Sequence, residues 1–277
     1  MTLGEVLGAT CEYLTRKGVA TPRLDAELIL STALGLTRLE LYTSFDKPLT
    51  EAERDLARGL VERRGRREPL AYVLGEWGFR RLALRTDARA LVPRPETETV
   101  VERSLAALGG IDAPRVVDVG TGTGAIALAI ADEYPGALVT ATDISAAALS
   151  LARENAERLG LSVEFVETNL LDGVAGPFDL VVSNPPYVGT EELAGLEPEV
   201  RDFEPRVALL DEGQTAALAR AARRVLGPGA AIVLECHAYR AAEVGSLLDR
   251  LGYEGVTISA DLAGRERVVA AREPIAG

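Results

Sequence analysis

The 277-residue chain has an ordinary hydrophobic content of 47% and a formal net charge of −12, which fits a globular protein with one large domain or a large and a small one. No apolar run reaches the length of a membrane span, and the N-terminus lacks the pattern of a signal peptide, so we expect a cytoplasmic protein without membrane association. Cys11 and Cys236 match no metal-binding spacing, and we expect neither a disulfide nor a zinc site.

The negative charge lies in the second part of the chain. Residues 1 to 75 carry 11 basic and 11 acidic side chains of the totals of 30 and 42, which leaves 19 basic and 31 acidic ones for residues 76 to 277. This excess of acid argues against binding to a phosphate backbone, so we expect no direct DNA binding. One basic cluster lies before residue 76, where the charge balance changes. It is either a solvated helix face or a docking patch for an acidic or RNA-associated partner. It comprises Arg54, Arg58, Arg63, Arg64, Arg66 and Arg67.

Residues 1–73 have a helical pattern. Apolar residues recur at helix spacing over residues 3 to 14, and Pro22 suits the first turn of a second helix. Thr50, with a glutamate three residues later, has the spacing of a capping box that begins a third helix. We therefore predict a small N-terminal helical bundle, followed over residues 74–93 by a β-hairpin linker, where short alternating stretches with glycines begin.

Residues 94–277 alternate between helical and strand patterns, which predicts an α/β domain of parallel strands with crossover helices. The first helix is expected over 97–108. Seven strands are expected at 115–119, 137–141, 163–166, 178–182, 230–235, 256–259 and 267–271. The helices between them are expected at 124–133, 146–159, 215–226 and 239–251. Residues 188–212 form a long acidic connection that contains prolines.

A glycine-rich turn, in "VVDVGTGTGAIALAIA", joins the first of these strands to an apolar helix. It comprises Gly120, Thr121, Gly122, Thr123 and Gly124. In this geometry backbone N–H groups can approach a nucleotide-like ligand, and Asp143, at the end of the next strand, is placed to accept hydrogen bonds from ribose hydroxyls. These residues predict an adenosine-containing cofactor. A nicotinamide cofactor would use similar parts, and a turn needed only for tight packing is a further alternative.

Two features favour S-adenosyl-L-methionine over a nicotinamide cofactor. The spacing G-x-G-x-G differs from the G-x-G-x-x-G that brings a diphosphate onto a helix N-terminus. Asp118, just before the loop, would repel a diphosphate, whereas it would suit the ammonium end of S-adenosylmethionine, directly or through water.

The stretch "VVSNPPYVG" follows the fourth strand with the residues Asn184, Pro185, Pro186 and Tyr187. This strand is expected to end beside the glycine loop, at the edge where open α/β sheets bind ligands. The Asn184 side-chain carbonyl and the Pro185 backbone carbonyl offer two acceptors for the N–H bonds of a planar amide or amine, and Tyr187 would press on the planar group. Such acceptors orient the nitrogen for methyl transfer and stabilise its developing positive charge, so no side-chain base is needed.

These motifs resemble a known family. "DVGTGTGAIALA" and "NPPY" look like class I S-adenosylmethionine-dependent methyltransferases, and "REPLAYVLGEWGF", "LVPRPETE", "FDLVVSNPPYV" and "DLAGRERVVAA" narrow the resemblance to the bacterial release factor glutamine methyltransferase (PrmC or HemK) family. The resemblance implies a Rossmann-like seven-stranded sheet with a helical substrate-docking domain. It also implies methylation of the side-chain amide nitrogen of the glutamine in the Gly-Gly-Gln motif of peptide chain release factors.

By position, the resemblance assigns cofactor binding to the glycine loop and to Asp143, Asn169, Leu170 and Asn184. Asn169 stands where the family often has an aspartate beside the adenine, so its hydrogen bond would be weaker or rearranged. The segment with Arg94 and Thr97 would lie over the cofactor or close the cleft, and the roles of both residues stay open. We interpret His237, the single histidine, as structural, because the reaction needs no base.

Three alternatives are open at this point. An enzyme that methylates a glutamine of a ribosomal protein would use the same four residues, although "REPLAYVLGE" favours the release factor enzymes. A DNA adenine methyltransferase shares the chemistry at an NH2 group, but the acidic second part argues against it. A non-catalytic module that binds the cofactor would have no use for two aligned acceptors.

Overall fold

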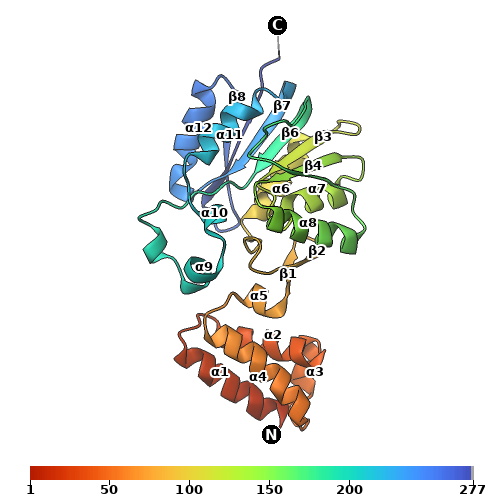
Figure 1. Ribbon diagram of the computed structural model, residues 1–277, viewed down its shortest axis with the longest axis vertical. Coiled ribbons are helices and arrows are strands. Elements are labelled where there is room, and N and C mark those ends of the chain that lie inside the picture. The colour runs from red at the N-terminus through yellow and green to blue at the C-terminus, as the bar shows by residue number, and fades with distance from the viewer. Residues whose placement is uncertain (276–277) are drawn as a thin grey trace. The chain divides into compact units, whose positions relative to one another are not determined.

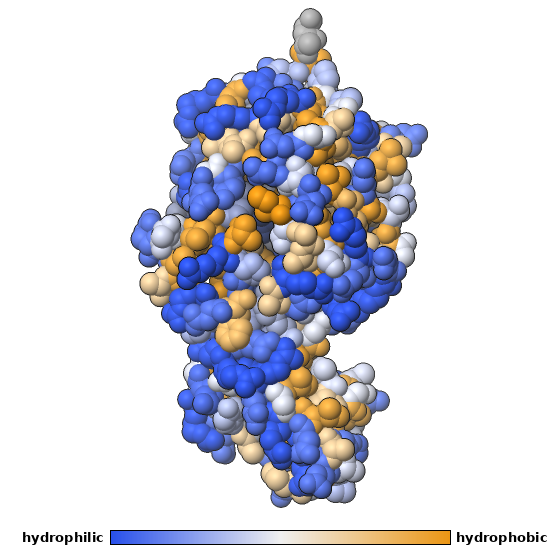
Figure 2. Space-filling view, viewed as in Figure 1, coloured by the Kyte–Doolittle hydropathy of each residue, from blue (hydrophilic) through white to orange (hydrophobic). Residues whose placement is uncertain are grey.

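The computed structural model describes residues 1–275, which fall into two compact units (Figure 1). The first unit contains Met1–Glu76 and, from much later in the chain, Leu196–Phe203. The second contains Trp77–Gly195 and the chain from Glu204 onward. Hydrophilic residues cover most of the visible surface of each unit, with apolar residues between them (Figure 2). Within the described residues, no helix is long and apolar enough to cross a membrane.

The first unit is helical, as predicted. Its helices are α1 (Leu3–Arg16), α2 (Pro22–Leu34), α3 (Arg38–Thr43), α4 (Glu51–Gly65), α5 (Leu70–Leu74) and α9 (Pro198–Phe203). Reciprocal capping boxes begin three of them, at Thr2, Thr37 and Thr50. Apolar residues of α1 to α5 pack into one core. The helical pattern of the sequence did not predict α3 and α5 as separate helices, because six and five residues are too few to show a helical period.

Both interpretations of the basic cluster are wrong for Arg64, because this side chain is buried. Its Nε lies 2.7 Å from Asp25 Oδ2 of α2, and its Nη1 lies 2.8 Å from Glu199 Oε1 of α9. Arg67 contacts the same Glu199 at 2.6 Å, and Arg63 pairs with Glu68. Arg64 and Arg67 thus supply ion pairs within the first unit that attach α9 to the helical bundle.

A hairpin of β1 (Glu76–Phe79) and β2 (Leu82–Arg85) begins at the last residue of the first unit's N-terminal segment and continues into the second unit. It lies within the predicted linker but is shorter. A seven-stranded sheet follows in the order β5-β4-β3-β6-β7-β9-β8. Its strands are β3 (Arg115–Val119), β4 (Leu138–Asp143), β5 (Glu164–Glu167), β6 (Phe178–Ser183), β7 (Leu226–Glu235), β8 (Glu254–Ala260) and β9 (Glu266–Arg272). The seven predicted strands are confirmed.

The expectation of an all-parallel sheet is wrong for β9, which pairs antiparallel with both β7 and β8. Only residues 261–265 join β8 to β9, and a connection that short cannot cross back to make a parallel pair. In addition, β7 begins at Leu226, which was predicted as the end of a helix, and so four residues before the predicted start of the strand at 230. The register of β7 with β6 shifts in this stretch.

Helices cover both faces of the sheet (Figure 1). They are α6 (Thr97–Ala107), α7 (Ala125–Glu133), α8 (Ala146–Leu159), α10 (Arg206–Leu209), α11 (Gln214–Ala222) and α12 (Ala241–Arg250), with short 3-10 turns η1 (Leu193–Gly195) and η2 (Ala238–Arg240). Because side chains alternate along a strand, Val116 packs in one core with α6 and α7, while Val117 packs in the other with α11 and α12. This burial fixes the strand ends where the candidate site lies.

Candidate active site

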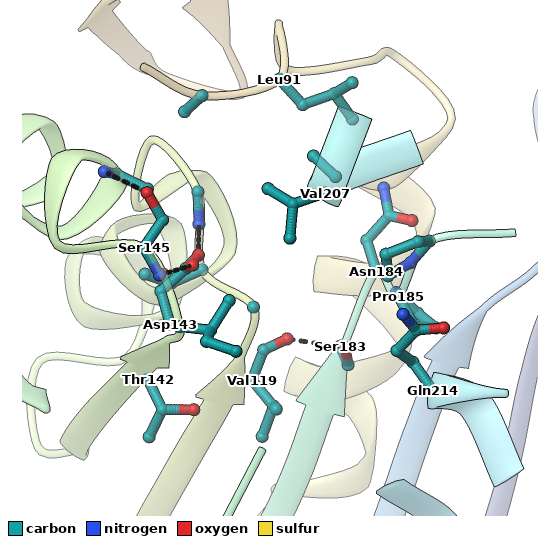
Figure 3. A pocket seen from close by; sticks show the side chains of 18 of the residues that line it. Leu91, Val119, Thr142, Asp143, Ser145, Ser183, Asn184, Pro185, Val207 and Gln214 are labelled. Carbon is teal, nitrogen blue, oxygen red and sulfur yellow. Dashed lines mark hydrogen bonds between the residues drawn. The ribbon is translucent and has the colours of Figure 1, made fainter. Parts of the chain in front are cut away.

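A cavity of about 480 Å³ opens in the second unit at the carboxyl ends of β3, β4, β5 and β6. Open α/β sheets bind ligands at this edge, and the volume is typical of small-molecule sites. The hydroxyl of Ser183 donates to the Val119 carbonyl at 2.6 Å and so ties the ends of β6 and β3 together (Figure 3). Further walls come from residues 89–94, with Thr97, and from several residues between Pro205 and Leu218.

The glycine loop lines the cavity with Gly120, Thr121, Gly122 and Thr123. Gly120 has φ +73°, and a Cβ built on it meets nothing within 4 Å, so its backbone is open to a close approach by a ligand. Gly124 lies outside the lining. A Cβ on Gly124 would come within 2.9 Å of Leu128 Cδ1, so this glycine serves the packing of α7 rather than the cavity.

Asp143, at the end of β4, lines the cavity and organises the loops around it. Its Oδ2 accepts from the Gly122 N–H at 2.9 Å, and its Oδ1 accepts from the Ser145 N–H at 2.9 Å (Figure 3). Partial burial raises the pKa of this carboxyl. Because a carboxylate offers about four acceptor sites, lone pairs stay free for hydroxyl groups of a ligand.

Asn169 and Leu170, which follow β5, also line the cavity. Leu170 has φ +52°, a left-handed conformation that is uncommon for a residue with a side chain. Its carbonyl accepts from the Thr142 hydroxyl at 3.0 Å, which fixes this turn against β4. The Asn169 side chain is exposed at the rim.

Asp118 does not line the cavity, so the structure disfavours a direct contact with a ligand's ammonium group, and the contact through water stays a prediction. The side chain is fully buried, and its Oδ2 accepts from the Thr121 hydroxyl at 2.6 Å and from the Ala127 N–H at 3.2 Å. Among the described residues, its Oδ1 has no hydrogen-bond partner. Burial therefore raises the pKa of Asp118 to about 7.

Asn184, Pro185 and Pro186 line the cavity. Asn184 and Pro185 lie on the side opposite Asp143 (Figure 3). The Nδ2 group of Asn184 donates to the Thr97 hydroxyl at 3.2 Å. This bond uses the amide nitrogen and leaves the side-chain carbonyl oxygen of Asn184 as an acceptor. Because Pro185 has no N–H, its backbone places no hydrogen-bond donor beside the Asn184 carbonyl oxygen.

Tyr187 does not line the cavity, in contrast to Asn184 and the prolines. Its ring centroid lies 6.1 Å from that of His237, and His237 lies 5.2 Å from Tyr239. Burial raises the pKa of Tyr187 to about 12, so its hydroxyl stays protonated. The structural interpretation of His237 agrees with its position, because its ring Nδ1 accepts from the Tyr239 N–H at the start of η2.

Two buried acids near the cavity were missed. Glu204 binds Arg94, whose Nη2 lies 2.8 and 2.6 Å from the two carboxylate oxygens. Glu235 accepts from the Thr97 hydroxyl at 2.7 Å. Glu235 had a signal in the sequence, since an acid inside the apolar strand "AIVLEC" is rarely buried without a purpose. Glu204 had none, because it lies among other acids of the long connection.

The comparisons with known proteins agree with this arrangement. The model of the PrmC N-terminal domain matches residues 5–75, and that of the methyltransferase small domain matches residues 102–195. The release factor glutamine methyltransferase of Deinococcus radiodurans is 45% identical over 278 residues, which cover 98% of this chain and 99% of that protein. That of Geobacter sulfurreducens is 41% identical, over 98% of this chain and 96% of that one.

A solved structure has a similar fold over part of this chain. It is a T. Thermophilus 16S rRNA methyltransferase in complex with AdoMet and guanosine, with a TM-score of 0.55 and 18% identity. The match covers 72% of this chain and 49% of that one. At this identity the likeness concerns the fold alone.

Proposed function

The chain belongs to the release factor glutamine methyltransferase family, and we propose that it transfers a methyl group from S-adenosylmethionine to the side-chain amide nitrogen of the glutamine in the Gly-Gly-Gln motif of peptide chain release factors. The observation that carries the chemistry is the orientation of Asn184. Its amide nitrogen is engaged by Thr97, so its carbonyl oxygen is left to accept from an incoming NH2 group. The relatives that carry the substrate assignment match almost end to end.

The cavity suits S-adenosylmethionine better than a diphosphate cofactor. Both arginines that line the cavity are already paired with carboxylates. Arg89 pairs with Asp87 and Glu154, and Arg94 pairs with Glu204. Neither guanidinium group is therefore available for phosphates. The open approach at Gly120 and the free acceptor sites of Asp143 fit a nucleoside. S-adenosylmethionine supplies an electrophilic methyl group. We assign its binding to Gly120, Thr121, Gly122, Thr123, Asp143, Asn169, Leu170 and Asn184.

The chain's own residues act on the glutamine amide. We propose that the Asn184 side-chain carbonyl and the Pro185 backbone carbonyl accept its two N–H bonds and hold the nitrogen in the plane that the reaction requires. As the nitrogen bonds to the methyl carbon and the bond from that carbon to sulfur breaks, positive charge develops on the nitrogen, and the same two oxygens stabilise it. The methylated nitrogen would then lose one proton to water and return to a neutral amide, with S-adenosylhomocysteine as the leaving group. Pro186 and the ring of Tyr187 would contact the part of the substrate next to this amide. Tyr187 would do so from outside the residues that line the cavity.

A panel assay tests the proposed function. The protein would be incubated with labelled S-adenosylmethionine and, separately, with release factors, ribosomal proteins and DNA, and mass spectrometry would locate any methyl group. We expect label on the glutamine of release factors. Label confined to a ribosomal protein or to adenine would overturn the proposal in favour of one of the two alternative enzymes.

A further inference from the structure

Three side chains from three separate elements form a continuous hydrogen-bonded chain that ends at the cavity. Glu235, the last residue of β7, accepts from the Thr97 hydroxyl at 2.7 Å. Thr97, the first residue of α6, accepts from Asn184 Nδ2 at 3.2 Å. The residue exposure of Glu235 is 0% and that of Thr97 is 4%, so water does not compete for the bond between these two side chains.

The direction of these bonds follows from the number of protons. A hydroxyl has one hydrogen to donate, and an ionised carboxylate can only accept, so the Thr97 hydroxyl must donate its hydrogen bond to Glu235. The hydroxyl then offers only lone pairs to Asn184, and only the NH2 end of the amide can donate to them. The two ends of an amide are nearly equal in size, so packing alone distinguishes them poorly.

We propose that Glu235 is a positioning residue, which acts through Thr97 to fix the amide of Asn184 with its carbonyl oxygen toward the substrate nitrogen. This inference rests on the proposed function, because the orientation matters for a substrate that brings N–H bonds. In the opposite orientation, the Asn184 NH2 group would face the substrate NH2 group. Two donors would then meet, and the developing positive charge would lose one acceptor.

Protonation of Glu235 reverses the direction in which the hydrogen bonds between Glu235, Thr97 and Asn184 are donated. The charged or titratable groups around Glu235 are Glu96 and Arg94 before α6, Tyr187 after β6, Cys236 beside it and Arg267 on β9. Burial raises the pKa of Glu235 to about 7. Once protonated, the acid can donate to Thr97, whose own proton is then free to bind the Asn184 carbonyl. We therefore expect the rate of methyl transfer to rise with pH as Glu235 ionises.

Matched substitutions on α6 test the inference by activity. Thr97→Val keeps the shape and removes the hydroxyl, so we expect kcat to fall about 10- to 100-fold with an unchanged Kd for S-adenosylmethionine. Thr97→Ser restores the hydroxyl and should stay within about threefold of the wild-type kcat. Thr99→Val is the control, since Thr99 is also buried on α6. A wild-type kcat in Thr97→Val would overturn the inference.

A second readout does not depend on turnover. The side-chain NH2 resonance of Asn184 would be followed by 15N NMR against pH in the full chain. We expect it to titrate in the wild type and to lose this titration in Glu235→Gln; a pH-independent wild-type resonance would overturn the inference. If the wild type leaves release factors unmethylated, the proposed function fails, while this titration still decides the role of Glu235.

Discussion

Arg94 and Glu204 form a two-oxygen ion pair beside the cavity, with Arg94 Nη2 at 2.8 and 2.6 Å from the carboxylate oxygens. Glu204 also accepts from the Val92 N–H at 3.4 Å. The pair joins the segment of Leu91 to Arg94 to the segment before α10, which carries Val207, and both segments form walls of the cavity (Figure 3). Residues more than 100 positions apart thus shape one side of the site.

Arg94→Met should loosen this wall. The substitution leaves Glu204 buried without its cation, and since Arg94 is itself partly exposed, we expect a loss of about 1–3 kcal/mol of unfolding free energy. Denaturant unfolding measures the loss, and calorimetric titration should show weaker binding of S-adenosylmethionine. The control is Arg103→Met, at an exposed position of α6. Equal stability and affinity in the two variants would contradict this role.

Asp143→Ala should weaken cofactor binding. It removes the acceptors proposed for the ribose hydroxyls and also the bonds to the Gly122 and Ser145 N–H groups. Hydrogen bonds to a charged group contribute about 1.5–3 kcal/mol, so we expect Kd to rise about 10- to 100-fold by calorimetry. Asp172→Ala, an exposed acid in the same unit, serves as the control. An unchanged Kd for Asp143→Ala would remove Asp143 from the site.

Arg64→Met should destabilise the first unit, because it leaves Asp25 and Glu199 without the cation that both contact. Removing one partner of a buried ion pair costs about 3–5 kcal/mol. Hydrogen exchange of the amides in α2, α4 and α9 should become faster. Arg66→Met, at an exposed position two residues away, should leave the exchange unchanged. Similar exchange in both variants would show that α9 is held by other contacts.

Asp118 should make stability depend on pH. Burial raises its pKa to about 7, so the folded state binds the proton more tightly than the unfolded state does. The resulting stability is fully present below about pH 4 and is lost as pH rises toward 7. Asp118→Asn removes the pH-dependent contribution of this carboxyl to stability. The unfolding free energy of the wild type relative to this variant should therefore fall by about 1 kcal/mol per pH unit between about pH 4 and 7. A constant difference from pH 5 to 7 would contradict the raised pKa.

Local patterns predicted most of the fold. Runs of branched residues, such as those before Asn184, indicate buried strands, and a capping box such as that at Thr50 indicates a helix start. Short elements without a full period, such as α9, were missed. The direction of β9 was also wrong, because alternation alone does not distinguish a crossover from a tight turn.

The candidate site was predictable where its residues follow strands directly. Asp143 and Asn184 come at strand ends, which the topology brings to one edge of the sheet. The partners that orient such residues were not predictable, because Glu235 reaches Asn184 only through Thr97, and these three residues are far apart in the chain. Hydrogen-bond partners of this kind depend on tertiary packing, which leaves no periodic trace in the sequence.

The most direct test of the central claim is to locate the methyl group on a release factor. Purified protein, S-adenosylmethionine and release factor would be incubated, and the product would be sequenced by tandem mass spectrometry, with Asn184→Ala in parallel. We predict one methyl group on the side-chain amide of the Gly-Gly-Gln glutamine with the wild type, and none with Asn184→Ala, although that variant should keep most of its cofactor affinity through the other residues assigned to cofactor binding. An unmodified glutamine with the wild type, or equal methylation by both proteins, would contradict the account.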